Sequence, residues 1–310
     1  MSDFVLTDDN YYSTEANKHF LSCSQYDDYM TCEAAALAKE QGFYIPKESK
    51  AFALGKYFHA ALEGEEAFGR FCDENFNDIF KTRELKSGEV KVTGKYADYE
   101  TIDNMIRFIN EDPVIKRYIE IPGQNEVSMT GNLFGMYPWK IRLDKLIRNP
   151  EMIVDWKTLG NIYETQYDAN EGERVPFTVS YGYYTRAAVY MEIYKQFTGK
   201  DIDPLFYLIC VSKQDPPDKE IVMMNERQRL DLELDKLYET LPRIWRVKTG
   251  VQKPDRCGTC DYCRSTKRIS GSIMAYELRP DSRPPKEQEY DDLWNRYTFV
   301  LEHDNAYKRN

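Results

Sequence analysis

Three charged residues in the middle of the chain, Asp144, Asp155 and Lys157, have the types and spacing of a site for metal-dependent chemistry on a phosphate. They belong to the segment 140–157, in which two apolar runs flank a polar Asn149-Pro150 centre. This pattern predicts a β-hairpin. If Asn149 and Pro150 are its central residues, Asp144 lies directly opposite Asp155. Lys157 follows two residues later, on the same face of its strand.

Two carboxylates at facing positions destabilise a hairpin, because cross-strand partners have Cβ atoms roughly 4.5–5.5 Å apart. A divalent cation between Asp144 and Asp155 would remove this repulsion. Mg²⁺ prefers hard oxygen ligands and is commonly bound by one or two carboxylates together with substrate phosphates. The ammonium group of Lys157 could then orient a water nucleophile or stabilise charge that develops on the phosphate. The three residues therefore predict a metal-dependent site.

The spacing of Asp144, Asp155 and Lys157 resembles the signature of the PD-(D/E)XK nucleases. More closely, the chain from about residue 18 to about residue 270 resembles the RecE-like exonucleases (exonuclease VIII type), which are often phage-encoded. That group adds a histidine on an upstream helix and a glutamate on a strand. The matching residues here are His59, in GKYFHAALEGEE, and Glu126, in NEVSMTGNLFG. The resemblance implies a Mg²⁺ or Mn²⁺ site in which Lys157 activates the attacking water and the metal ligands are Asp144, Asp155, Glu126 and His59.

The resemblance also implies a fold and an activity. The fold is an α/β restriction-endonuclease-like core, in which helices flank a mixed central β-sheet. The activity is processive 5′→3′ digestion of linear double-stranded DNA ends, which leaves 3′ single strands for phage or prophage recombination. The implied partners are duplex DNA ends, a RecT-type single-strand annealing protein and further copies of the chain in a ring-like homo-oligomer.

A long helix predicted at about 178–197 offers a further contact with DNA. In related nucleases this helix usually carries a glutamine four residues before a tyrosine. Here Arg186 stands four residues before Tyr190. Because an arginine suits a phosphate oxygen, we expect Arg186 and Tyr190 to contact the DNA backbone.

Three cysteines near the C-terminal end of the core, Cys257, Cys260 and Cys263, follow a C-x₂-C-x₂-C pattern. Soft thiolates select zinc or an iron–sulfur cluster, and both need a fourth ligand. In the AddB nuclease domain, which this arrangement resembles, an iron–sulfur staple joins one cysteine before the core to three after it. Cys32 resembles that upstream ligand, and Cys23 is the alternative. We therefore expect a [4Fe–4S] cluster or Zn²⁺ that clips the chain ends together and takes no part in chemistry on DNA.

Periodicity and turn residues predict the elements that position these side chains. We expect a loose N-terminal segment at 1–20, a core domain at 21–271 and a C-terminal extension at 272–310 with a helical patch near 287–302. Within the core, residues 73–95 read as a polar loop or lid with several lysines, and residues 158–178 as a polar loop. Helices are predicted at 22–42, 51–71, 97–111, 113–119, 178–197 and 226–247, and strands at 126–136, 204–212 and 219–225.

Composition limits the alternatives. The 310 residues can bury a full core. The sequence has neither an apolar run of ~20 residues nor an apolar leader, which predicts a cytoplasmic protein without a membrane partner. A net charge of −10 argues against a general DNA-coating protein. Three other hypotheses stay open: an AddB-like or CRISPR-associated iron–sulfur nuclease of different polarity, an inactive nuclease-fold binding protein, and a zinc-stapled regulatory protein.

Overall fold

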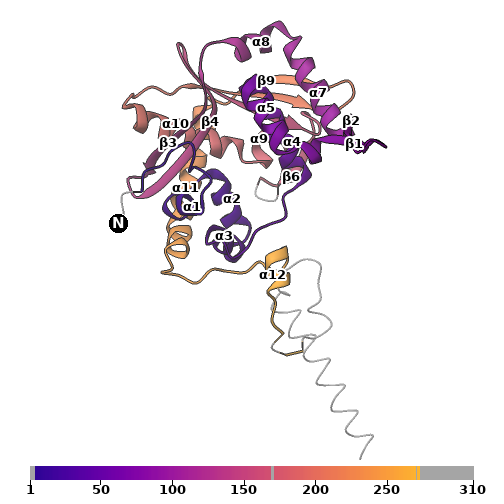
Figure 1. Cartoon of the computed structure of the whole chain (residues 1–310). Coiled ribbons are helices and arrows are strands. Elements are labelled where there is room, and N and C mark those ends of the chain that lie inside the picture. Colours follow the sequence, from indigo (N-terminus) through magenta and orange to yellow (C-terminus); the bar gives the residue numbers. More distant parts are fainter. Residues whose placement is uncertain (1–3, 169–170, 270, 273–310) are drawn as a thin grey trace, which may run out of the picture. The chain divides into compact units, whose positions relative to one another are not determined.

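The computed structural model describes residues 4–168, 171–269 and 271–272 (Figure 1). The chain divides into two units, Met1–Ser265 and Thr266–Asn310. All helices and strands named below belong to the first unit. The predicted C-terminal extension, apart from residue 272, and its helical patch lie outside the described residues.

A five-stranded sheet forms the centre of the first unit, with the strand order β3-β4-β5-β8-β9. The pair β5–β8 is parallel and the other three pairs are antiparallel, so the sheet is mixed as predicted. Strand β8 is almost fully buried, in keeping with its apolar sequence. The bounds are β3 Gln124–Leu133, β4 Tyr137–Arg148, β5 Glu151–Leu159, β8 Leu205–Ser212 and β9 Lys219–Met223.

Helices cover both faces of the sheet, which gives the layered α/β architecture (Figure 1). One face packs against α10 (Tyr183–Thr198) and α11 (Arg227–Lys248). The other face packs against α4 (Lys50–Glu63) and α7 (Ala97–Asn110). The crossover between the parallel strands β5 and β8 includes β6 (Thr165–Asp168), β7 (Glu173–Pro176), α9 (Phe177–Ser180) and α10. The predicted polar loop at 158–178 thus contains a short two-stranded sheet.

The hairpin of β4 and β5 has the predicted register. Its paired residues run from Arg148 with Glu151 to Lys145 with Val154, and Asn149 and Pro150 form the turn, joined by a cis peptide bond. The ladder ends there, one step before Asp144 and Asp155 would face each other. The two strands therefore open at the position of the two aspartates, and the expected direct pair is not formed.

The N-terminal part differs from prediction in two ways. Residues 4–20 are packed rather than loose: Ala16 in α1 (Thr14–His19) is fully buried, and Lys140 donates a hydrogen bond to Asn17 Oδ1 over 2.7 Å. The helix expected at 22–42 is broken into α2 (Cys23–Thr31) and α3 (Glu33–Glu40). The break is at Cys32, whose backbone is extended (φ −164°, ψ 105°). This kink sets the direction in which the Cys32 thiol points.

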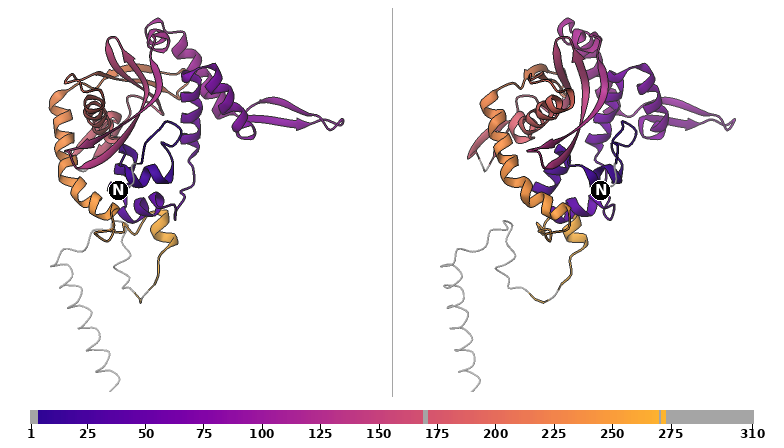
Figure 2. Two further views of the ribbon diagram at one scale, coloured as in Figure 1. Left: turned by 60° about the vertical axis from the view of Figure 1, so that its left-hand side comes forward. Right: turned by 90° about the vertical axis from the view of Figure 1, so that its left-hand side faces the viewer.

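The segment expected to be a loop or lid at 73–95 is instead a short helix followed by a β-hairpin. Helix α6 (Phe76–Ile79) leads into β1 (Phe80–Glu84), which pairs with β2 (Val90–Lys95). The hairpin projects from the body of the unit (Figure 2). The helix predicted at 51–71 is divided into two helices, α4 and α5 (Glu65–Glu74). They are separated by Gly64, whose φ of 142° lies outside the helical region.

The remaining described helices are α8 (Pro113–Glu120) and α12 (Asp261–Ser265). Helices α7, α8 and α11 agree with the predicted ranges to within one residue at each end. Among the helices in the described part of the chain, none combines the length and the apolar character needed to cross a bilayer.

Candidate active site and cysteine cluster

Three potential metal ligands converge from three elements. His59 comes from α4, Glu126 from β3 and Asp144 from β4, and one ligand atom of each lies within 4.8 Å of the other two. His59 Nδ1 is 3.5 Å from Asp144 Oδ2. All three side chains are half-buried. The structure thus brings together three of the four metal ligands that the sequence predicts.

Glu126 reaches this group through an irregular backbone. Its φ is +53°, a value that a residue with a Cβ rarely adopts, and it interrupts the ladder between the pairs of Asn125 and Val127 with β4. Arg142 holds the carboxylate, with Nε 2.5 Å from Glu126 Oε2. Burial and the neighbouring Asp144 carboxylate raise the pKa of Glu126, although Arg142 counteracts them. Arg142 lies two residues before Asp144 on the same strand and was not among the predicted site residues.

Asp144 occupies the opening between β4 and β5. Its Oδ2 accepts a hydrogen bond from the backbone N–H of Trp156 over 2.8 Å. This bond satisfies a donor that the ladder no longer pairs, and it ties Asp144 to the strand that carries Asp155 and Lys157. The opening therefore replaces a repulsive carboxylate pair by a carboxylate that bridges two strands.

Asp155 is buried, with 1% of its surface exposed, and forms ion pairs with two cations. Lys157 Nζ is 2.5 Å from Asp155 Oδ2, and an Arg186 guanidinium nitrogen is 3.6 Å from Oδ1. Burial alone would raise the pKa of Asp155, but Lys157 and Arg186 hold it below the ordinary range. Conversely, burial would lower the pKa of Lys157, and Asp155 raises it above the usual value. Both groups are therefore charged at neutral pH.

The predicted DNA contacts on α10 occupy different surroundings. Arg186 is partly exposed and lies beside Asp155. Tyr190 is 8% exposed, and its ring packs 6.0 Å from that of Phe206 in the core. The contact of Tyr190 with DNA remains a prediction, and its burial favours a packing role. Tyr183, which was not among the predicted site residues, also belongs here, because its ring lies 5.6 Å from both Lys157 Nζ and the Arg186 guanidinium. Its position three residues before Arg186 on a helix could have identified it.

The donor set suits a divalent cation. Ligands at 2.0–2.1 Å from one ion lie at most about 4.2 Å apart, so the three donor atoms within 4.8 Å need only a small convergence to share an ion. Asp155 Oδ2 is a buried oxygen whose contact with Lys157 lacks the angles of a hydrogen bond, and no other described residue supplies one. Asp155 lies outside the group of three converging donors, so its role as a fourth metal ligand stays a prediction.

Comparison with known families agrees with this geometry. Residues 22–266 match a family described as a PDDEXK-like domain of unknown function (DUF3799). The chain belongs to this family. The match spans both the candidate site and the three clustered cysteines of the C-terminal segment. A PDDEXK-like domain implies a divalent metal site.

The solved structures that match this DUF3799 chain include the two described here, and no curated protein matches it. The first is a crystal structure from Eubacterium rectale, provisionally described as an exonuclease. It is 31% identical in sequence, with a TM-score of 0.77 over 89% of this chain and 99% of the other. The second, SSO0001, covers 73% of this chain and 90% of the other at 14% identity, and its TM-score of 0.28 supports no argument. The first structure supports the nuclease fold of the DUF3799 chain.

The four cysteines predicted to bind a metal or cluster lie together in the DUF3799 structure. The sulfur atoms of Cys32, Cys257, Cys260 and Cys263 are within 4.8 Å of one another, with Cys32 Sγ 3.6 Å from Cys263 Sγ. Cys23 instead packs in the main core, so Cys32 is the better placed of the two upstream cysteines. Four converging thiols suit Zn²⁺ or an iron–sulfur cluster equally in donor type.

Backbone N–H groups donate hydrogen bonds to two of the cluster sulfurs, although burial raises the pKa of the Cys260 thiol. Cys257 Sγ accepts a hydrogen bond from the N–H of Cys260 over 3.3 Å, and Cys260 Sγ accepts one from the N–H of Cys263 over 3.4 Å. The N–H groups of Cys260 and Thr259 lower the pKa of the Cys257 thiol to about 6. The segment is fixed to α3, since Asp255 O accepts a hydrogen bond from the N–H of Ala34.

Proposed function

We propose that this chain is a divalent-metal-dependent deoxyribonuclease that digests linear duplex DNA from its ends in the 5′→3′ direction. The observation that carries the proposal is the convergence of His59, Glu126 and Asp144 next to the buried Asp155–Lys157 pair. A chain that only binds DNA has no need to hold three potential metal ligands beside a buried cation. The similarity to a provisionally described exonuclease supports the choice of chain ends as the place of cleavage.

The side chains divide the work between metal binding and the nucleophile. A bound divalent cation would polarise the scissile phosphate and lower the pKa of an attacking water. His59, Glu126, Asp144 and Asp155 would hold it. Lys157, which stays protonated beside Asp155, orients the water and stabilises negative charge on the phosphate oxygens. Arg186 and Tyr183 fix Lys157 and Asp155 from the side of α10.

The wider biological proposal follows the RecE-like resemblance. The chain would act in the cytoplasm, as a homo-oligomer that passes the 3′ strand to a RecT-type annealing protein during phage-type recombination. In a second proposal, which the four-cysteine cluster favours, it is an AddB-like or CRISPR-associated iron–sulfur nuclease of different polarity. An inactive binding protein is disfavoured by the charged, converging site.

Digestion of end-labelled duplex DNA tests the proposed function and its polarity. Linear duplexes that carry a label at either the 5′ or the 3′ ends are incubated with Mg²⁺ or Mn²⁺, beside closed circular DNA. We expect early release of the 5′ label and an intact circle. Early release of the 3′ label would favour the second nuclease proposal. No digestion with either metal would contradict both.

The imidazole of His59 predicts a preference for Mn²⁺ over Mg²⁺. Mg²⁺ demands oxygen ligands in near-ideal geometry, whereas transition-metal ions accept a nitrogen donor more readily. We expect calorimetric titration without DNA to show about ten-fold tighter binding of Mn²⁺. His59→Asp, which restores an oxygen donor, should reduce this ratio. An equal ratio in wild type and His59→Asp would show that His59 is not a ligand.

A further inference from the structure

The β1–β2 hairpin is an exposed arm that the candidate site does not use. Residues 81–93 are all exposed, and the hairpin stands away from the body of the unit (Figure 2). Its turn is ordered by hydrogen bonds between Leu85 and Glu89 and between Gly88 and Leu85. At 3.2–3.4 Å per residue, each strand extends about 17–20 Å. The arm is long enough to reach a ligand beyond the body of the protein.

One face of the arm is positively charged. Lys81 and Arg83 alternate along β1 on one face, and Arg83 is directly opposite Lys91 in β2. Like charges at facing positions destabilise a hairpin. In the part of the chain that the structure describes, no carboxylate lies within 4.0 Å of the charged nitrogens of Lys81, Arg83, Lys86 or Lys91. The cations on this face are therefore available to bind an external anion.

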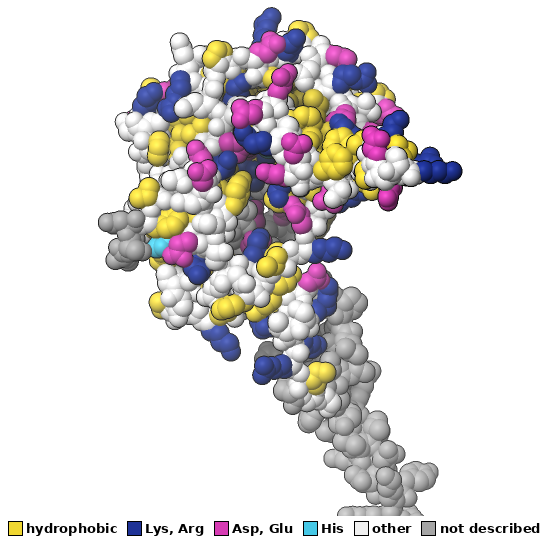
Figure 3. Space-filling view, in the orientation of Figure 1, with side chains coloured by type: hydrophobic (Ala, Val, Ile, Leu, Met, Phe, Trp, Pro, Cys, Tyr) yellow, Lys and Arg dark blue, Asp and Glu magenta, His cyan; other side chains and the backbone are white. Residues whose placement is uncertain are grey.

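The local charge is opposite in sign to that of the chain. Residues 80–95 contain five lysines and arginines against two glutamates, whereas the whole chain has a net charge of −10. Lys86 adds a cation in the turn, and Lys and Arg side chains gather at the end of the projection (Figure 3). A cationic arm on an acidic protein attracts a polyanion selectively to one place.

The root of the arm is fixed to the helix that carries His59. Lys95 Nζ donates hydrogen bonds to Tyr57 OH over 2.7 Å and to Asp103 Oδ2 over 2.6 Å. The N–H of Tyr96 bonds to the carbonyl of the fully buried Ile79. Tyr57 precedes His59 by two residues on α4, so a ligand held by the arm has a defined position relative to the site.

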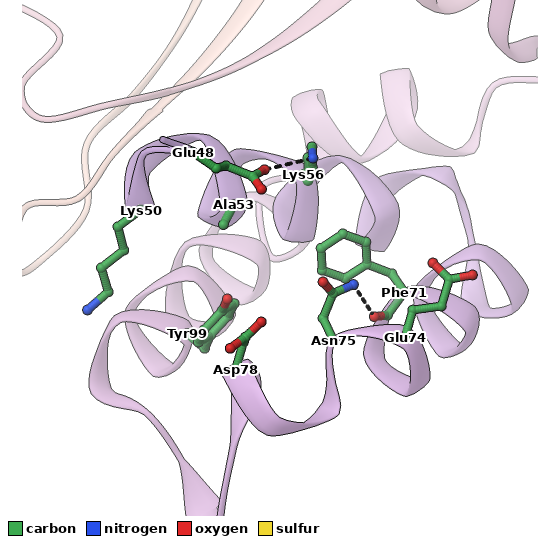
Figure 4. A pocket seen from close by; sticks show the side chains of 9 residues that line it. All are labelled: Glu48, Lys50, Ala53, Lys56, Phe71, Glu74, Asn75, Asp78 and Tyr99. Atoms are coloured by element: carbon green, nitrogen blue, oxygen red, sulfur yellow. Dashed lines mark hydrogen bonds and ion pairs between the residues drawn. The ribbon is translucent and has the colours of Figure 1, made fainter. Parts of the chain in front are cut away.

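A hollow of about 580 Å³ beside the root does not suit the same ligand. Its lining includes three carboxylates, those of Glu48, Glu74 and Asp78, which the close-up shows around the space (Figure 4). The two lysines that also line it form ion pairs with carboxylates, Lys56 with Glu48 and Lys50 with Asp98. These carboxylates would repel a phosphate, so the cationic face of the arm is the better place for an anion.

We infer that the β1–β2 hairpin is a DNA-binding arm, whose face of Lys81, Arg83 and Lys91, with Lys86 at the tip, contacts the phosphate backbone of duplex DNA. A two-stranded ribbon has the width of the major groove, and four cations can neutralise phosphates along its edges. This inference rests on the proposed function, because it assigns the duplex substrate to the arm.

The salt dependence of binding tests the arm. The arm variant replaces the four cations of the arm: Lys81→Ala/Arg83→Ala/Lys86→Ala/Lys91→Ala. A control variant replaces three exposed lysines and one exposed arginine elsewhere: Lys47→Ala/Lys116→Ala/Arg117→Ala/Lys253→Ala. Binding of a short fluorescent duplex is measured by anisotropy in EDTA, which prevents digestion, between about 50 and 200 mM salt. We expect the arm variant to reduce the slope of log K against log salt by about 2–4, and the dissociation constant to rise about ten-fold or more. The control should keep the wild-type slope.

The outcomes separate this inference from the proposed function. If the wild-type protein digests duplex DNA but the arm variant and the control have the same slope, the inference is wrong and the nuclease proposal stands. If only the arm variant loses binding but the wild type digests nothing, the arm inference stands alone. Loss of self-association in the arm variant, measured by sedimentation, with an unchanged slope would show instead that the arm binds a second copy.

Discussion

Replacing Lys157 by methionine is expected to reduce the rate of DNA digestion by about 10²–10³-fold, the usual loss when one group that stabilises transition-state charge is removed. Methionine keeps most of the volume and removes the charge. Because Asp155 holds the pKa of Lys157 above its ordinary value, the side chain acts as a cation at neutral pH and not as a base. Digestion of end-labelled duplex in single-turnover conditions measures the effect on chemistry.

A matched control is needed, because the change also leaves Asp155 with one cation fewer. Removing one partner of a buried ion pair costs about 3–5 kcal/mol, and Arg186 offsets part of this loss. Lys140, on the other strand of the same hairpin, is also buried, with 2% of its surface exposed, and burial lowers its pKa to about 8. It bonds to Asn17 rather than to the site. Lys140→Met should therefore lower the melting temperature but keep the rate per folded molecule. If both variants lose the same activity, Lys157 has only a structural role.

The hairpin register illustrates what the sequence could predict. The register depends on the turn residues Asn149 and Pro150 and on the apolar runs beside them, all of which are local. The position where the ladder ends is not local. It depends on Asp144 bonding to the N–H of Trp156, and on Arg186 from α10 approaching Asp155. Both contacts bring together residues that periodicity does not relate.

The difference between local signals and long-range contacts also explains why other elements were predicted wrongly. A break between α2 and α3 at Cys32 could not be predicted, because residues 33–38 are strong helix formers and the kink aligns the thiol with cysteines more than 200 positions later. No side chain of β1 or β2 is buried, and the apolar alternation is limited to Val90 and Val92, which is too short to predict a strand. The helices α7 and α11, with regular apolar faces, were predicted closely.

The cysteine cluster should contribute strongly to stability, because it closes a very long loop. Cys32 and Cys263 are 231 positions apart, and their sulfurs are 3.6 Å from each other. By analogy with a disulfide, closing a loop of this length stabilises the fold by roughly 5 kcal/mol. Cys32→Ser and Cys263→Ser should each lower the melting temperature by about 10 °C or more and release the bound metal or cluster. Scanning calorimetry and elemental analysis for zinc and iron measure the two effects.

Cys23→Ser is the matched control for this prediction. Cys23 is buried, as are Cys32 and Cys263, so the change removes the same sulfur from a packed site. It lies in the main core and not in the cluster. We expect Cys23→Ser to keep full metal content and most of the stability, whereas loss of metal would identify Cys23 as the fourth ligand.

An absorbance band in the visible range of the wild type, absent from Cys263→Ser, would identify an iron–sulfur cluster, and a colourless zinc-containing protein would identify Zn²⁺. Because the cluster joins α3 to the C-terminal segment and leaves the His59 site untouched, variants that remain folded at low temperature should still digest DNA.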